Sequence, residues 1–142
     1  MLHGLDTTFL VQVAVSQHPG HAAARSLLDR LLTSGDTFAL APQVLAEFVH
    51  VTTDEKRFEH PLTSQRALDC ALAWWNAAEV VQIFPGAEAT RLFFLWMKQH
   101  RLGRKRILDT QLAATYYHAG VRSILSTNAR DYRVFDCFEI LG

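Results

Sequence analysis

The chain has 142 residues, of which 49% are hydrophobic and 20% are charged, so it is long enough for one globular domain with a buried core. Fourteen lysines and arginines balance fourteen aspartates and glutamates, which excludes a general positive field for nucleic acid and leaves polyanion contacts to a local patch. No apolar stretch reaches the roughly 18 residues of a membrane span, and no signal-peptide pattern opens the chain, so we expect a cytoplasmic protein without a membrane partner.

Strands and helices are predicted to alternate along the chain. Strands are expected at 2–6, 38–41, 80–84 and 121–126, with a possible edge strand at 138–141. Helices are expected from 7 onward, at 21–32, after Pro42, at 63–75, at 87–100 and at 107–118. This order predicts a single α/β domain over residues 1–142, with a central, mostly parallel sheet of four to five short strands flanked by helices.

Apolar residues recur at helical spacing in the later helices and predict which faces are buried. Leu92, Leu95 and Trp96 form the expected buried stripe of the helix at 87–100. In the next helix Leu108 and Leu112 mark the buried face, and an aspartate, Asp109, lies on or near it.

Four acidic residues stand out by their positions. Asp6 ends the first predicted strand, and Asp131 follows the fourth. Glu47 lies among apolar residues in a helix, and Asp109 lies in the first turn of another. Because parallel α/β sheets form their sites at the carboxyl ends of the strands, these side chains are candidates for one cluster. Asp109 has a second interpretation, in which it only caps the backbone of its own helix.

Clustered carboxylates repel one another and persist only where protons or cations neutralise them. The seven histidines are scattered, and Cys70 and Cys137 are far apart, so no zinc-ligand spacing occurs. Oxygen ligands alone favour Mg²⁺ or Mn²⁺. Such a site can activate water against a phosphodiester.

Four segments, taken in order, resemble the PIN-domain ribonucleases, and most closely the small VapC-like toxins of type II toxin–antitoxin pairs. The segments are Leu5-Asp6-Thr7-Thr8-Phe9-Leu10, Ala46-Glu47-Phe48, Asp109-Thr110-Gln111-Leu112-Ala113-Ala114 with Gly120 behind it, and Ser126-Thr127-Asn128-Ala129-Arg130-Asp131-Tyr132. Thr8 stands where the family more often has asparagine or serine, and Tyr132 where it usually has phenylalanine.

The resemblance implies an endoribonuclease toxin that cleaves RNA, commonly tRNA or ribosomal RNA, is neutralised by a cognate antitoxin and forms a homodimer. It implies that Mg²⁺ or Mn²⁺ is bound by the catalytic acids Asp6, Glu47, Asp109 and Asp131. It also implies supporting roles for Thr8, Ser126 and Asn128.

Basic residues beside two of these acids are candidates for RNA binding. Arg104, Lys105 and Arg106 precede Asp109, and Arg130 precedes Asp131. They could contact RNA phosphates, pair with the acids of the cluster or lie in solvent. The run from Asp54 to Glu59 is interpreted as a solvated loop.

Two other functions remain open from the sequence. One is a housekeeping PIN nuclease that works without an antitoxin. The other is a non-catalytic module that keeps the fold and binds RNA or protein at the place where the acids lie. The intact set of four acids argues against this second function. No phosphate-binding glycine motif and no G-x-S-x-G motif occurs, which excludes the common nucleotide-binding and serine-hydrolase patterns.

Overall fold

A computed structural model describes all residues from 1 to 142 and contains five strands, seven α-helices and one short 3₁₀ helix. The strands are β1 (Leu2–Leu5), β2 (Thr37–Leu40), β3 (Val80–Gln82), β4 (Ser123–Leu125) and β5 (Glu139–Leu141). The helices are α1 (Thr7–Ala14), α2 (His21–Thr33), α3 (Pro42–Thr52), α4 (Ser64–Trp75), α5 (Ala87–Gln99), η1 (Arg104–Arg106), α6 (Ile107–His118) and α7 (Ala129–Arg133).

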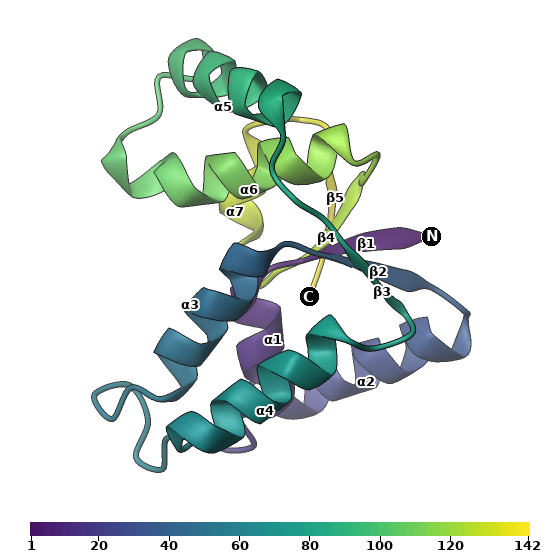
Figure 1. Ribbon diagram of the computed structural model, residues 1–142, viewed down its shortest axis with the longest axis vertical. Helices are drawn as coiled ribbons and strands as arrows, with labels where there is room; N and C mark the ends of the chain where they lie inside the picture. The colour runs from purple at the N-terminus through teal and green to yellow at the C-terminus, as the bar shows by residue number, and fades with distance from the viewer.

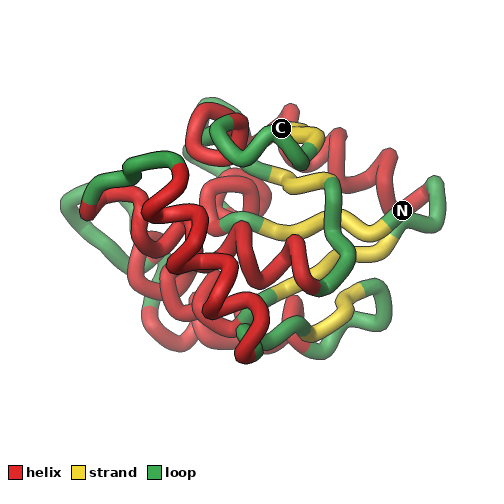
Figure 2. Tube along the Cα trace, turned by 90° about the horizontal axis from the view of Figure 1, so that it is seen from above, coloured by secondary structure: helices red, strands yellow, loops and turns green.

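The strands form one sheet in the order β3-β2-β1-β4-β5, and every neighbouring pair is parallel. Figure 2 shows the strands side by side between helices. The chain first moves outward from β1 to β2 and β3, then returns to β4 on the other side of β1. The direction of winding therefore reverses between β1 and β4, which is where open parallel sheets place their ligands.

The helices form two layers, one on each face of the sheet. Helices α1 to α4 lie on one side and α5 to α7 on the other (Figure 1). This division follows from right-handed crossovers, which put helices on opposite faces when the chain winds in opposite directions. The core contains fully buried aromatic side chains on both sides, among them Phe9, Phe48, Tyr116 and Tyr132.

Local sequence signals account for several element boundaries. Pro42 occupies the first turn of α3, and the Thr63 side chain accepts a hydrogen bond from the Arg66 amide at the start of α4. Gly35 and Gly120 follow α2 and α6 with φ of 78° and 85°, the left-handed conformation that often ends a helix at glycine.

The predicted sheet is confirmed, including the edge strand at the end of the chain, but two predicted buried side chains are exposed. Leu95 is 56% exposed because α5 packs through the adjacent Trp96, and Leu108 is 71% exposed. The first turn of α6 extends past the core, so Leu108 borders a pocket while Leu112, one turn later, is buried. The short helices η1 and α7 were not predicted. No helix combines the length and the apolar character that crossing a membrane requires.

Candidate active site

Three of the four predicted acids border a single pocket of about 750 Å³ at the carboxyl end of the sheet. Asp6 follows β1, Glu47 lies in the middle of α3, and Asp109 lies in the first turn of α6. We call this the acidic pocket. The fold therefore brings together residues that are more than 100 positions apart in the chain.

Asp6 is the most buried of the three, with 5% of its surface exposed. Its Oδ1 accepts the Thr7 amide at 2.8 Å, so it also caps α1. Its Oδ2 accepts the hydroxyls of Ser126 at 2.6 Å and Thr8 at 3.3 Å. Burial raises the pKa of Asp6, and these hydrogen bonds oppose the rise because they stabilise the ionised form.

The segment after β4 supports Asp6 from the neighbouring strand. The Asp6 amide donates to the Leu125 carbonyl at 3.1 Å, which continues the β1–β4 pairing to the start of the site. The Ser126 hydroxyl accepts the Asn128 amide at 3.0 Å, and the Thr8 hydroxyl accepts the Thr127 amide at 3.1 Å. Asn128 thus contributes to the site through its backbone, while its side chain makes no hydrogen bond to the protein.

Asp109 carries the clearest electrostatic signature of the site. Burial, followed by the charges of Asp6, Asp131 and Glu47, raises its pKa to about 7, and the Arg106 guanidinium opposes this rise. At the pocket wall, desolvation and the Asp6 charge also raise the pKa of Glu47. Acids with raised pKa values at one pocket indicate negative charge that the surrounding protein does not neutralise.

Asp131 lies beside this group, on α7, and outside the acidic pocket. Arg106 spans the gap to it: its Nη2 donates to the Asp131 backbone carbonyl, and its Nε lies 3.8 Å from Oδ1 of the carboxylate. Of the alternatives left open for Arg106, pairing with an acid of the cluster is therefore the one seen in the structure.

The other basic candidates are divided between two places. Arg104 and Lys105 are exposed and border the acidic pocket, directly before the helix that carries Asp109. Arg130 is exposed and borders a smaller depression together with Asp131.

Four residues that lie near the acids were assigned no role in the site from the sequence. His50 and Arg57 border the acidic pocket, although Arg57 was interpreted as part of a solvated loop. Tyr116 and Tyr132 are fully buried beside Asp6. Tyr116 donates to the Leu5 carbonyl at 2.6 Å, whereas the Tyr132 hydroxyl lies near the Asp6 carboxylate without a hydrogen bond of good geometry. His50 lies one helical turn after Glu47, and this spacing could have predicted that the two side chains share one face of the helix.

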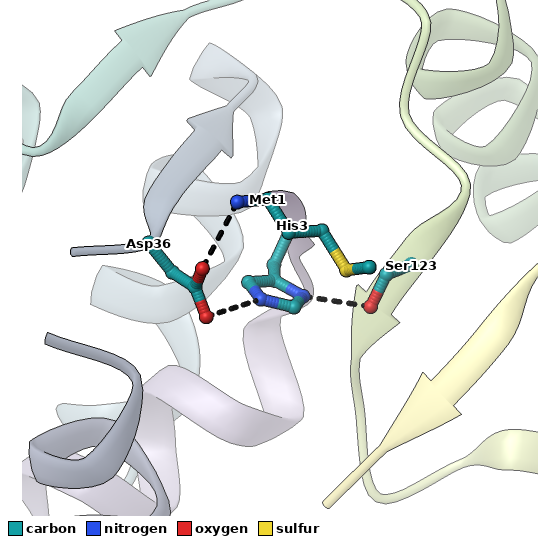
Figure 3. A network of polar contacts seen from close by, with 4 residues as sticks. All are labelled: Met1, His3, Asp36 and Ser123. Atoms are coloured by element: carbon teal, nitrogen blue, oxygen red, sulfur yellow. Dashed lines mark hydrogen bonds and ion pairs between the residues drawn. The ribbon is translucent and has the colours of Figure 1, made fainter. Parts of the chain in front are cut away.

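A second polar cluster lies at the amino ends of the central strands, opposite the acidic pocket. His3 Nδ1 is 2.7 Å from the Ser123 hydroxyl, and His3 Nε2 is 3.2 Å from Oδ2 of Asp36, whose Oδ1 binds the Met1 amine (Figure 3). The residue types are those of a serine-hydrolase triad. However, His3 and Ser123 are 2% and 3% exposed, so no substrate reaches them and the cluster instead ties β1 to β4 and to the start of β2.

The donor chemistry of the site fits a hard divalent cation. The candidate ligands are all carboxylates, with no imidazole or thiolate among them, which favours Mg²⁺ or Mn²⁺ over zinc. In the structure itself, no group of three or more histidine, cysteine, aspartate or glutamate side chains is close enough to hold one ion. Closer approach of these acids would need a bound cation to offset the repulsion that raises the Asp109 pKa.

Comparison with known proteins gives consistent results. The family model described as PIN domain matches residues 5–136. Ribonuclease VapC43 of Mycobacterium tuberculosis is 28% identical over 110 residues, which cover 78% of this chain and 75% of that protein. Ribonuclease VapC25 of the same organism is 35% identical over 57 residues, so the match covers only 40% of its length.

Solved structures share the fold at lower sequence identity. The structure of VapC20 from Mycobacterium tuberculosis, described as a Sarcin-Ricin loop cleaving toxin, has a TM-score of 0.69 and 17% identity and covers 92% of each chain. The structure of VapBC2 from Rickettsia felis, bound to promoter DNA, has a TM-score of 0.66 and 20% identity, covering 99% of this chain and 98% of the other.

Proposed function

The chain belongs to the PIN domain family, and on this premise we propose that it is an endoribonuclease of the VapC-like toxin type, which hydrolyses RNA phosphodiester bonds with the help of a divalent cation. The observation that carries the proposal is the acidic pocket. Three carboxylates from separate elements border it, and the Asp109 pKa is raised to about 7 by its acidic neighbours. A non-catalytic module would have no need for this costly concentration of charge.

Asp6, Glu47, Asp109 and Asp131 would hold Mg²⁺ or Mn²⁺. The bound cation would supply an activated water and neutralise charge on the phosphate. Attack of that water on the phosphorus, with cleavage of the P–O3′ bond, would leave a 5′-phosphate on one product and a 3′-hydroxyl on the other. The role of the protein's own side chains is to hold the acids. Ser126 and Thr8 bind the Asp6 carboxylate, and the Asn128 amide holds the Ser126 hydroxyl in place.

The proposed substrate is a structured RNA, either tRNA or ribosomal RNA. Arg104 and Lys105, at the edge of the acidic pocket, are proposed to contact its phosphates, as is Arg130 beside Asp131. Arg106 is proposed to have two roles. It holds Asp131, and the part of its side chain that remains exposed is available to contact a phosphate.

The proposed partners are a cognate antitoxin and a second copy of the chain, in the cytoplasm. Support for the antitoxin comes from solved neighbours that are toxin–antitoxin complexes. Exposed apolar side chains on α5, Phe94 and Leu95, give the homodimer proposal a surface to bury. A mass equal to one chain, measured by light scattering, would exclude the dimer. If the protein inhibits growth and co-expression of the adjacent open reading frame does not relieve the inhibition, that gene does not encode the antitoxin.

The central experiment is the cleavage of total cellular RNA by purified protein with Mg²⁺, with Mn²⁺ and with chelator. Wild type is expected to give discrete fragments only with a metal ion. Asp109→Asn is expected to lose this cleavage by at least about 100-fold, since it removes a carboxylate from the acidic pocket. Sequencing of the fragment ends would identify the target and test for the 5′-phosphate.

A matched control for Asp109→Asn is Asp29→Asn, which makes the same change at an exposed position of α2. This variant should cleave like wild type. Fragments that persist in chelator, or in Asp109→Asn at the wild-type rate, would exclude the proposed site.

A further inference from the structure

A second pocket adjoins the acidic pocket on the far side of Glu47. It has a volume of about 560 Å³, and we call it the side pocket. Three residues, Glu47, Val51 and Arg57, border both pockets, so the two pockets are neighbours at these residues. The side pocket is lined mainly by polar residues, including Thr8, Gln12, His18, Glu59 and Thr127. Its volume falls within the range of roughly 300–1,000 Å³ that is typical of ligand sites.

Arg57 lies where the two pockets meet. Its side chain is 59% exposed, and its Nε pairs with Oδ2 of Asp54 at 3.3 Å. Neither of its two Nη groups binds an acceptor in the protein. A guanidinium with free Nη groups, held at one edge by a carboxylate, suits contact with a phosphate.

The loop that carries Arg57 is fixed to the rest of the fold. The Gln17 side chain donates to the His60 carbonyl at 2.7 Å and accepts the His60 amide at 3.4 Å. The Leu62 amide donates to the Thr52 carbonyl at 2.9 Å. The backbone at Arg57 is therefore held in position before any ligand arrives, which lowers the entropic cost of binding.

The charges of the side pocket suit a base better than a second phosphate. Glu59 would repel a phosphate but can accept a hydrogen bond from a base amino group. His18 Nδ1 accepts the Gly20 amide at 3.0 Å, so the neutral ring carries its proton on Nε2 and can donate. Gln12 adds an amide that both donates and accepts.

We propose that the side pocket binds the base of a nucleotide adjoining the cleavage site, and that Arg57 binds the phosphate between that nucleotide and the acidic pocket. The RNA strand would then pass over Glu47, with Arg104 and Lys105 on the other side of the acids. This inference rests on the proposed nuclease function. It assigns substrate positioning to Arg57 and base selection to His18.

The test uses a short RNA that contains the mapped cleavage site. Arg57→Ala is expected to raise KM by roughly tenfold or more with little change in kcat, because the contact is present in both the ground state and the transition state. Arg57→Lys should recover only part of the loss, since it cannot bind bidentately. Arg66→Ala, an exposed arginine of α4 that borders neither pocket, is the control.

A binding measurement gives a readout without cleavage. Fluorescence anisotropy of the same RNA on Asp109→Asn, with and without Arg57→Ala, should show weaker binding and a salt-dependence slope lower by roughly 0.7, the value for one phosphate contact on a single strand. Wild type and His18→Ala are also compared on RNAs in which the base at each position next to the cleavage site is changed in turn. At one of these positions, wild type should prefer a particular base and His18→Ala should show no preference.

The outcomes separate this inference from the nuclease proposal. If Asp109→Asn abolishes cleavage while Arg57→Ala and His18→Ala retain wild-type KM, RNA affinity and base preference, the inference is wrong and the nuclease assignment stands. If wild type leaves RNA intact with either metal ion, the nuclease proposal itself is wrong, and the inference falls with it.

Discussion

Tyr132 is a buried side chain whose hydroxyl lies near the Asp6 carboxylate but makes no hydrogen bond of good geometry, and it follows Ser126 and Asn128 in the chain. It is 0% exposed, and burial together with the charges of Asp6 and Asp109 raises its pKa well above the usual value. An unpaired buried hydroxyl costs about 1–3 kcal/mol relative to a satisfied one.

Tyr132→Phe is therefore expected to leave the free energy of unfolding unchanged or to raise it by up to about 1 kcal/mol, because it removes an unsatisfied group and keeps the ring. Urea denaturation of the two proteins measures this difference. Tyr116→Phe is the contrasting variant: its hydroxyl bonds the Leu5 carbonyl, so its loss should destabilise the protein. A loss of more than 1 kcal/mol in Tyr132→Phe would mean that the hydroxyl donates a hydrogen bond to the Asp6 carboxylate in solution.

At the scale of elements, β1 and α6 pack so closely that only glycine fits between them. A Cβ placed on Gly4 would lie 2.7 Å from the Tyr116 ring. The ring in turn reaches the ends of two strands: its hydroxyl donates to the Leu5 carbonyl and accepts the Ala41 amide at 3.3 Å. Tyr116 thus holds together the ends of β1 and β2 just before Asp6 and α3.

Gly4→Ala is expected to lower the free energy of unfolding by about 1–3 kcal/mol, since the ring is fully buried and the surrounding core must shift to make room. Thermal denaturation would measure the effect. Gly103→Ala is the control, because nothing lies within 4 Å of the added Cβ and its φ of -89° is ordinary for alanine. Equal melting temperatures for Gly4→Ala and wild type would contradict the close packing.

Elements with a periodic pattern were predictable, and short elements that depend on distant contacts were not. The five strands and the long helices follow from apolar runs, Pro42 and the glycines that end helices. Helix α7 has five residues, too few for a helical period to be visible. The sequence left three interpretations of Arg106 open, because its partner Asp131 is 25 positions away in the chain and a contact at that distance is not visible in the pattern. Arg57 was missed because nothing in a polar loop indicates which pocket it borders.

At the scale of the whole molecule, the grouping of acids makes the metal-free protein sensitive to pH. Ordinary aspartates have a pKa near 3.9, whereas that of Asp109 is raised to about 7 in the fold, and those of Asp6 and Glu47 are also raised. The folded state therefore binds more protons than the unfolded state between these values. The stability that Asp109 contributes is complete below about pH 4 and is lost as the pH rises through about 7.

In chelator, the melting temperature is therefore expected to fall as the pH rises from 5 to 8, and Asp109→Asn should reduce this slope. Asp36, whose pKa is lowered by the Met1 amine and His3, acts in the opposite direction, but only at lower pH. Differential scanning calorimetry across this pH range tests the expectation. A melting temperature that stays constant in chelator would mean that the acids do not repel one another as described.

The order of the strands also determines when the site can exist during synthesis. Ribosomes deliver the chain from its N-terminus, and a chain made only as far as α5 already contains Asp6 and Glu47. It lacks Asp109, and it lacks β4, whose Leu125 carbonyl and following Ser126 hydroxyl hold Asp6. Until the last quarter of the chain has emerged and entered the sheet, an unfinished protein cannot assemble the acidic pocket, so any chemistry at this pocket begins only when the sheet is complete.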